Sequence, residues 1–124
     1  MTQHPELGFY TLAGAPDSPR DLIDEVHDAE ALGLGAAFIS ERFNIKEAAT
    51  LSGAAGAVSN DIRIVTGATN HNTRHPIVTA SYATTMHRLT GGRFVLGSAC
   101  AVPRMTPPEK LEAATRAVED HGWY

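Results

Sequence analysis

The chain has 124 residues, of which 43% are hydrophobic and 19% are charged, a composition typical of one globular domain over residues 1–124. Its net charge of −4 and its scattered Lys and Arg residues exclude the dense positive patch that nucleic acid or an anionic membrane requires. The single Cys100 cannot form a disulfide within the chain, and no apolar run reaches the length of a signal peptide or membrane span. We therefore expect a cytoplasmic protein.

Four short apolar runs predict β-strands, and a helical pattern follows each of them. The run at residues 36–40 shows no alternation of apolar and polar positions, which is typical of a strand buried on both faces. The predicted strands cover residues 7–12, 36–40, 62–65 and 93–97.

The first predicted helix begins near Ser18, a good N-cap, with Pro19 at the first helical position. Gly33 then ends the helix, as a glycine after the last helical turn commonly does. The residues expected to face the core are Leu22, Val26, Ala29 and Leu32.

Two further helices are predicted at residues 47–59 and 76–90, and a capping box at residues 106–109 predicts a last one. A face of small residues on the helix at 47–59 favours close packing of another helix, from this chain or from a partner subunit. That small face comprises Ala49, Gly53 and Gly56. The expected core residues are Ala48, Leu51, Ala55 and Val58 in the first helix and Val78, Tyr82, Met86 and Leu89 in the second.

Successive strand–helix units predict an α/β fold with a parallel sheet and right-handed crossovers. A complete (β/α)8 TIM barrel takes about 250 residues, so four such units correspond to a half-barrel. Four parallel strands cannot close, which leaves two edges and one face open. Three explanations of how the chain accommodates these open edges and this open face remain: two chains pair, the chain is a marginally stable truncated product, or residues 98–124 cover the open face.

Polar residues gather after the third strand, at residues 67–75, where α/β proteins usually place their chemistry. They form either a ligand site or only a well-bonded strand-to-helix connection. Glu41 ends the second strand and is a candidate for orienting a ligand or for acid–base catalysis, with ion pairing to Arg42 as the alternative. His71 and His75 lie in a turn rather than on a helix, so we expect no metal site.

Three stretches carry a family resemblance: FISE at residues 38–41, GATN at 67–70 followed by TRHP at 73–76, and LTGGRFVLG at 89–97. Together they resemble the N-terminal half of the bacterial luciferase-like monooxygenase family. Within that family the chain is most similar to the branch that uses the deazaflavin coenzyme F420, which includes methylenetetrahydromethanopterin reductase-like proteins. The resemblance spans residues 7–97.

The resemblance implies that coenzyme F420 or FMN lies at the carboxyl ends of the strands and exchanges a hydride with a small organic substrate, or reacts with oxygen in the case of FMN. It implies a bulge with a non-prolyl cis peptide at Gly67 and Ala68 that supports the ring from behind. Thr69 and Asn70 would bond polar groups of the cofactor, and Glu41 would be the catalytic residue. Many relatives form a homodimer through the helices that correspond to residues 47–59 and 76–90.

The chain also departs from the family pattern. Relatives carry a second glycine two residues after Gly97, where this chain has Ala99, and strands five to eight supply much of their phosphate-tail site and substrate pocket. We expect a flavin- or F420-dependent oxidoreductase or monooxygenase in truncated form. The alternative is a non-catalytic half-barrel that pairs with itself or with a full-length paralogue.

Overall fold

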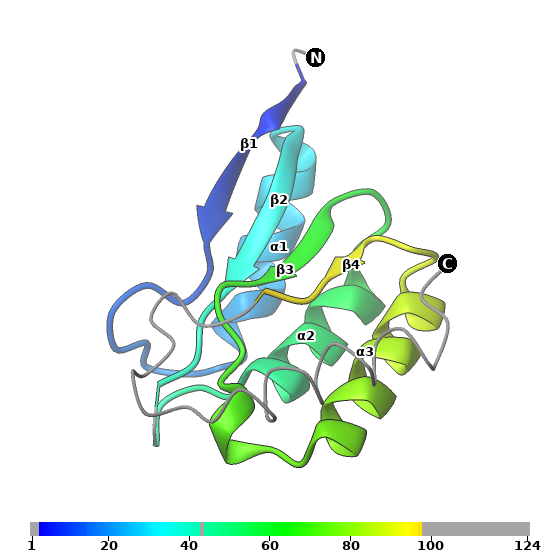
Figure 1. Ribbon diagram of the computed structural model, residues 1–124. Helices are drawn as coiled ribbons and strands as arrows, with labels where there is room; N and C mark the ends of the chain where they lie inside the picture. The colour runs from blue at the N-terminus through cyan, green and yellow to red at the C-terminus, as the bar shows by residue number, and fades with distance from the viewer. Residues whose placement is uncertain (1–2, 43, 98–124) are drawn as a thin grey trace.

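The computed structural model describes residues 3–42 and 44–97, in which strands and helices alternate along the chain (Figure 1). The strands are β1 (His4–Tyr10), β2 (Leu34–Ile39), β3 (Arg63–Thr66) and β4 (Phe94–Val95). The helices are α1 (Asp21–Ala31), α2 (Ala48–Val58) and α3 (Pro76–Leu89), with the short 3-10 helix η1 (His71–Thr73) before α3. The predicted order of elements is confirmed, and the helix predicted from residue 106 lies outside the described residues.

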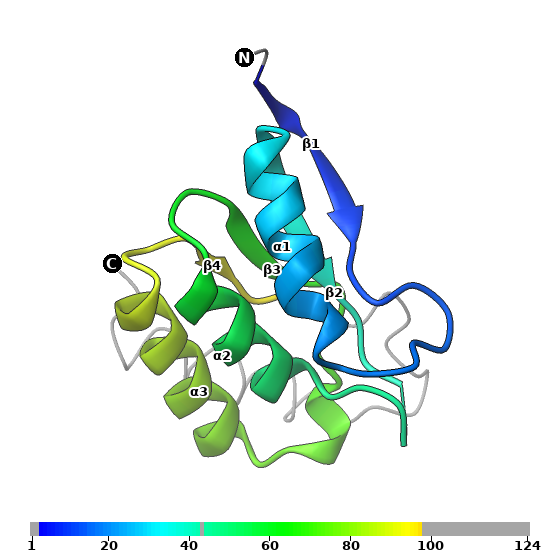
Figure 2. The same cartoon turned by 180° about the vertical axis from the view of Figure 1, so that it is seen from behind.

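The four strands form one parallel sheet in the order β1-β2-β3-β4, as predicted for consecutive units of a (β/α)8 fold. Helix α1 lies behind β2 in Figure 1 and in front of β2 in Figure 2. Helix α2 packs against α1, and α3 runs beside α2. In the part of the chain that the structure describes, no helix is both long and apolar enough to cross a membrane.

The core lies between the sheet and the three helices. Alternate strand residues enter it, because successive side chains of a strand point to opposite faces. Complete burial of one Leu, Ile or Val side chain contributes about 1.5–3 kcal/mol. The core includes Ala37, Ile39, Ile64 and Phe94 from the sheet and Leu22, Val26, Leu51, Ala55, Ala83 and Met86 from the helices.

The opposite face of the sheet carries one row of apolar side chains that runs across all four strands. Tyr10 is in register with Phe38, Phe38 with Val65, and Val65 with Val95. The Tyr10 and Phe38 rings are in contact, with centroids 5.5 Å apart, yet Tyr10 is 59% and Val95 45% exposed. Among the described residues this face is therefore the open side of the half-barrel; on it Ala36 of β2 is buried and Phe38 is only partly buried.

Helix α1 begins later than the sequence predicted. Ser18 does not cap it: the Ser18 hydroxyl accepts a hydrogen bond from the Arg20 amide in a turn before the helix, which starts at Asp21. The predicted stripe is correct for three of its residues, but Leu32 is 63% exposed because the helix has already ended at Ala31. Gly33 follows with a φ of 73°, which confirms its predicted role at the helix end.

The buried stripe of helix α3 agrees with the prediction at Met86 and, in part, at Tyr82, but not at its other two residues. Val78 and Leu89 were expected in the core, but they are 53% and 51% exposed. The buried stripe instead comprises Thr79, Ala80, Ala83 and Met86, because its small residues let the helix approach α2 closely. Gly56 of α2 is part of this contact, since a Cβ there would lie 2.8 Å from Thr90 and 3.1 Å from Met86. Packing within the chain therefore explains Gly56.

Arg93 joins the end of α2 to the start of β3 and β4. Its guanidinium donates to the Ser59 hydroxyl at 2.9 Å, to the Ile62 carbonyl at 2.6 Å and to the Ser59 carbonyl at 2.9 Å, while Nε donates to the Thr90 carbonyl at 3.0 Å. These bonds satisfy carbonyl groups that have no ladder partner at the amino edge of the sheet. The arginine of the GGRF stretch therefore has a structural role.

Replacing Arg93 with Met tests that role. We expect the free energy of unfolding, measured by urea denaturation, to fall by about 2–4 kcal/mol, because several buried acceptors lose a charged donor. The matched control is Arg63→Met, which removes an exposed arginine of β3 and should change the free energy of unfolding by less than about 0.5 kcal/mol. Equal effects of the two substitutions would contradict the assignment.

Candidate functional site

The turn after β3 carries a cis peptide bond between Gly67 and Ala68, at the position that the family resemblance implied. The backbone fixes this turn on both sides. The Gly67 amide donates to the Ile39 carbonyl of β2 at 2.8 Å, and the Thr69 amide donates to the Gly97 carbonyl beyond β4 at 2.9 Å. The turn therefore sits at the carboxyl edge of the sheet, held to both neighbouring strands.

Two buried threonine hydroxyls support this turn from within the protein. Thr66 is 1% and Thr69 0% exposed, and the Thr69 hydroxyl donates to the Thr66 hydroxyl at 2.8 Å. The Gly97 amide donates to the same Thr66 oxygen at 2.8 Å. A Cβ at Gly97 would lie only 1.8 Å from the Thr66 carbonyl oxygen, so this close approach requires glycine.

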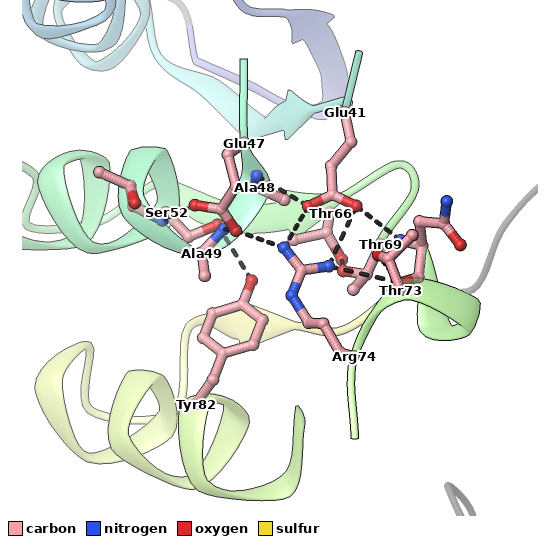
Figure 3. A network of polar contacts seen from close by, with 12 residues as sticks. Glu41, Glu47, Ala48, Ala49, Ser52, Thr66, Thr69, Thr73, Arg74 and Tyr82 are labelled. Carbon is pink, nitrogen blue, oxygen red and sulfur yellow. Dashed lines mark hydrogen bonds and ion pairs between the residues drawn. The ribbon is translucent and has the colours of Figure 1, made fainter. Parts of the chain in front are cut away.

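Glu41 follows β2, and its carboxylate joins three segments of the chain (Figure 3). One oxygen accepts from the Ala48 amide at the start of α2 at 3.0 Å, and the other accepts from the Asn70 amide in the turn at 2.6 Å. The Arg74 guanidinium donates to both oxygens. The ion-pair partner of Glu41 is therefore Arg74, and not the neighbouring Arg42 that the sequence suggested.

Glu47 is a second carboxylate in the same cluster, and it caps α2. It accepts from the Ala49 amide at 2.9 Å and from the Thr50 amide at 2.7 Å, which satisfies two of the amides that a helix N-terminus leaves free. Arg74 also donates to Glu47. Figure 3 shows the Arg74 guanidinium between the two carboxylates, and its side chain is only 13% exposed.

These contacts set the protonation states of the cluster. Burial alone would raise the pKa of Glu41, but hydrogen bonds from Arg74 and from the Asn70 and Ala48 amides outweigh it and lower that pKa below its usual value. Burial would also raise the pKa of Glu47, but hydrogen bonds from the Thr50 and Ala49 amides and from Arg74 outweigh it and lower that pKa to about 2. Both glutamates are ionised at neutral pH, so Glu41 is poorly suited to donate a proton there.

A buried hydroxyl pair lies on the helix side of the cluster. The Tyr82 hydroxyl of α3 donates to the Ser52 hydroxyl of α2 at 3.3 Å, and Ser52 is 0% exposed. Burial raises the pKa of Tyr82 to about 12, so its hydroxyl stays protonated and remains a donor. The Tyr82 ring meets Phe94 edge to face, with centroids 5.3 Å apart. Tyr82 thus ties α3 to α2 just behind the cluster.

The segment between β3 and α3 is organised by side-chain caps. The Asn70 side-chain oxygen accepts from the Asn72 amide at 3.1 Å and so caps η1. The His75 Nδ1 accepts from the Ile77 amide at 3.3 Å and so caps α3. Within residues 3–42 and 44–97, no group of three His, Cys, Asp or Glu side chains is arranged to hold a metal ion.

A cavity of about 330 Å³ lies against this segment, which is enough space for part of a small organic molecule. Burial and the nearby Arg74 charge lower the pKa of His71, so its imidazole is neutral at neutral pH. Its Nδ1 and the hydroxyl of Thr79 are buried without a hydrogen-bond partner among the described residues. The cavity is lined by His71, Asn72, Thr73, Arg74, His75, Pro76 and Thr79.

The structure brings the predicted site residues Glu41, Gly67, Ala68, Thr69 and Asn70 into one region. They are joined by the direct bond between Glu41 and the turn. Four residues that hold this region together were not predicted as site residues. For Arg74 the only signal was its place in the TRHP stretch, and for Glu47 it was its place just before a helix. The four residues are Glu47, Thr66, Arg74 and Tyr82.

The lowered pKa values predict a loss of stability in acid. A carboxylate whose pKa is depressed by folding stabilises the protein above its unfolded pKa, near 4.5, and that stabilisation is lost as the pH falls through the folded pKa. The free energy of unfolding of the wild-type chain should therefore decrease between about pH 5 and pH 2. Glu41→Gln should lower the free energy of unfolding at pH 7 by about 2 kcal/mol and make its decrease in acid shallower.

Urea denaturation at a series of pH values measures this dependence. The control is Asp28→Asn, which removes an exposed carboxylate of α1 that lies outside the cluster. It should leave the acid dependence as it is in the wild type. If Glu41→Gln shows the full wild-type decrease, the cluster does not control the acid stability of the protein.

Comparison with known proteins identifies relatives of this chain. The chain is 31% identical over 81 residues to the 5,10-methylenetetrahydromethanopterin reductase of Methanopyrus kandleri, an alignment that covers 65% of this chain and 23% of that protein. The solved structure of the coenzyme F420-dependent tetrahydromethanopterin reductase from the same organism matches with a TM-score of 0.68 and 28% identity. That match covers 77% of this chain and 27% of the other.

A second structural match is the oxygenating constituent of 3,6-diketocamphane monooxygenase from Pseudomonas putida, solved in complex with FMN. Its TM-score is 0.72 at 17% identity, over 92% of this chain and 37% of the other, which shows a shared fold. The chain thus spans roughly a quarter to two fifths of the length of these relatives. The family model of the luciferase-like monooxygenases matches residues 2–108. The chain therefore belongs to the luciferase-like monooxygenase family.

Proposed function

We propose that this chain forms one wall of the cofactor site of a flavin-type oxidoreductase, with coenzyme F420 or FMN against the turn at residues 67–70. The observation that carries the proposal is how the turn at residues 67–70 is held at the carboxyl edge of the sheet, by buried hydroxyls and by both neighbouring strands. Gly67 and Ala68 carry no long side chain, as support for a flat ring requires.

The surroundings of the turn fit a flat aromatic ring. A Cβ built on Gly67 would point towards Phe38 and Tyr10, at 3.4 Å from the ring of Phe38 and 3.5 Å from the hydroxyl of Tyr10. These two residues belong to the apolar row on the open face of the sheet. Aromatic side chains and exposed backbone therefore meet where the ring would lie. The cofactor, when bound, would supply hydride transfer or, for FMN, reaction with oxygen.

Each predicted site residue has a role in this proposal. Gly67 and Ala68 would contact the ring through their backbone, and Thr69 would support the turn through its buried hydroxyl. Asn70 is exposed and would face polar groups of the cofactor. Glu41 would orient the turn through the Asn70 amide rather than transfer a proton, because it is ionised and each of its oxygens already accepts two hydrogen bonds.

The relatives support both cofactors. The reductase from Methanopyrus kandleri is described as coenzyme F420-dependent, and the monooxygenase from Pseudomonas putida was solved with FMN. The higher identity belongs to the reductase, so we favour F420 for this chain. The substrate would be a small organic molecule that accepts or donates a hydride, and the cavity beside residues 71–76 offers part of the space for it.

Titration of the purified chain with F420 and with FMN tests the proposal through the fluorescence and absorbance of the cofactor. We expect saturable binding with a shifted spectrum. Gly67→Leu should weaken binding at least about tenfold, because the added side chain occupies the place of the ring. Thermal unfolding of the same variant, measured in parallel, separates lost binding from lost folding.

The control for this substitution is Ala31→Leu, which adds an apolar side chain at an exposed position of α1. It should bind the cofactor like the wild type. Absence of binding and of any spectral shift with both cofactors would overturn the proposed function. It would favour the second candidate, a non-catalytic half-barrel that pairs with another barrel chain through its open face, where Tyr10 and Val95 are exposed.

We further propose that the chain forms a homodimer through α2 and α3. Val78 and Leu89 are about half exposed and eleven residues apart, which places them on one side of α3 after three helical turns. Ile77, which directly precedes Val78 in the sequence, is 58% exposed. On α2, a Cβ at Gly53 would meet no atom within 4 Å, so another helix has room to approach there.

Sedimentation measures this association. The wild-type chain should sediment as a dimer at micromolar concentration, and the double substitution Val78→Glu and Leu89→Glu should convert it to a monomer, because charge at the centre of an apolar interface is poorly tolerated. Leu32→Glu changes an exposed leucine at the end of α1 and should leave the dimer intact. A monomeric wild type would rule out this interface.

A further inference from the structure

We propose that Arg74 is a positioning residue for the cofactor turn, and that it acts through Glu41 and the Asn70 backbone. This inference rests on the proposed function of residues 67–70. Arg74 itself belongs to the segment after the turn and makes no contact with Gly67 or Ala68 among the interactions that the structure gives. Arg74 would hold the Glu41 carboxylate in place, and that carboxylate would hold the turn through the Asn70 amide.

The contacts of Arg74 reach three separate elements. One guanidinium nitrogen donates to Glu41 at 3.1 Å and to the Asn70 carbonyl at 3.4 Å, and the other donates to both Glu41 and Glu47. Glu41 follows β2, Glu47 caps α2, and Asn70 ends the turn after β3. A single side chain thus fixes the carboxyl end of one strand, the start of a helix and the turn relative to one another.

Only an arginine can make this set of contacts. Its planar fork presents several donors in fixed directions and remains charged at every working pH, whereas a lysine presents one compact ammonium group. The hydrogen bonds that Arg74 donates to Glu41 and Glu47 raise the pKa of Arg74 still further. The site therefore depends on the geometry of the guanidinium as well as on its charge.

Arg74 is also the cation that balances the carboxylates. Among the residues that the structure describes, the charged and titratable groups of this cluster around Glu41 are Arg74, Glu47 and the neutral imidazole of His71. The nearby Lys46 ammonium instead donates to the Leu12 carbonyl at 2.8 Å. Without Arg74, two carboxylates would lie close together without a cation between them, so Glu41 would take up a proton at a higher pH.

Protonation of Glu41 would directly weaken the hydrogen bond that holds the turn. The oxygen that accepts from the Asn70 amide is only 2.6 Å from that nitrogen, and a protonated carboxyl group is a weaker acceptor than a carboxylate. Asn70 lies two residues after Ala68, at the end of the cis turn. Loss of Arg74 should therefore loosen the turn in a pH-dependent way, which a purely structural contribution of the side chain would not do.

The test compares cofactor affinity in the wild type, Arg74→Met and Arg74→Lys between pH 5 and pH 8, with thermal unfolding of each protein in parallel. The wild-type dissociation constant for the cofactor that it binds, F420 or FMN, should change little over this range. Arg74→Met should bind roughly tenfold more weakly at pH 8 and lose further affinity towards pH 5. Arg74→Lys should keep the flat pH profile but recover only part of the affinity.

Two further variants sharpen the result. Arg88→Met removes an exposed arginine near the end of α3 and should bind like the wild type at every pH. Combining Arg74→Met with Glu41→Gln should weaken binding no more than the stronger single change, because both substitutions break the same chain of contacts. The double variant should also lose the pH dependence of Arg74→Met, since its glutamine does not titrate.

The outcomes separate this inference from the proposed function. If the wild type binds neither F420 nor FMN, the proposed function fails and this inference fails with it. If the wild type binds but Arg74→Met binds equally well at every pH, only the role of Arg74 is overturned. A pH-independent loss of affinity that matches a fall in melting temperature would also overturn it, because Arg74 would then contribute stability alone.

Discussion

The carboxylate of Glu41 is the constraint on which the carboxyl end of this half-barrel depends. It accepts from the first turn of α2, from the turn after β3 and from Arg74, and so joins segments up to 33 residues apart in sequence. Hydrogen bonds to a charged group are stronger than neutral ones. Because both oxygens are occupied, the carboxylate fixes positions and has little freedom to take part in proton transfer.

A similar arrangement holds the amino end of the sheet, where no chemistry is expected. Glu30 of α1 accepts from three consecutive amides, those of residues 60–62, at 2.6–3.0 Å, and Arg93 donates to the carbonyls of the same connection. Charged side chains therefore order the loops at both ends. The difference lies in what the loops present: the amino end turns directly back into β3, whereas the carboxyl end presents the cis turn.

The sequence predicted the fold well because the strands and helices follow simple periodic patterns, and it located the turn at residues 67–70 through the family resemblance. It misjudged the face of α3, because Val78 and Leu89 are more apolar than the small residues that actually pack against α2. It also offered the neighbouring Arg42 as one possible ion-pair partner of Glu41, and did not find Arg74. Contacts across 33 residues, such as that of Glu41 with Arg74, leave no periodic signal in one sequence.

Polar side chains support the turn at residues 67–70 from within the protein. Thr66 and Thr69 are buried and bond to each other, and Glu41 and Arg74 neutralise each other beside them. The surface left for a ligand is the cis turn with the aromatic pair Tyr10 and Phe38 on the open face. In the proposed function such a wall would hold and orient a flat ring, and the cofactor would supply the reactive group.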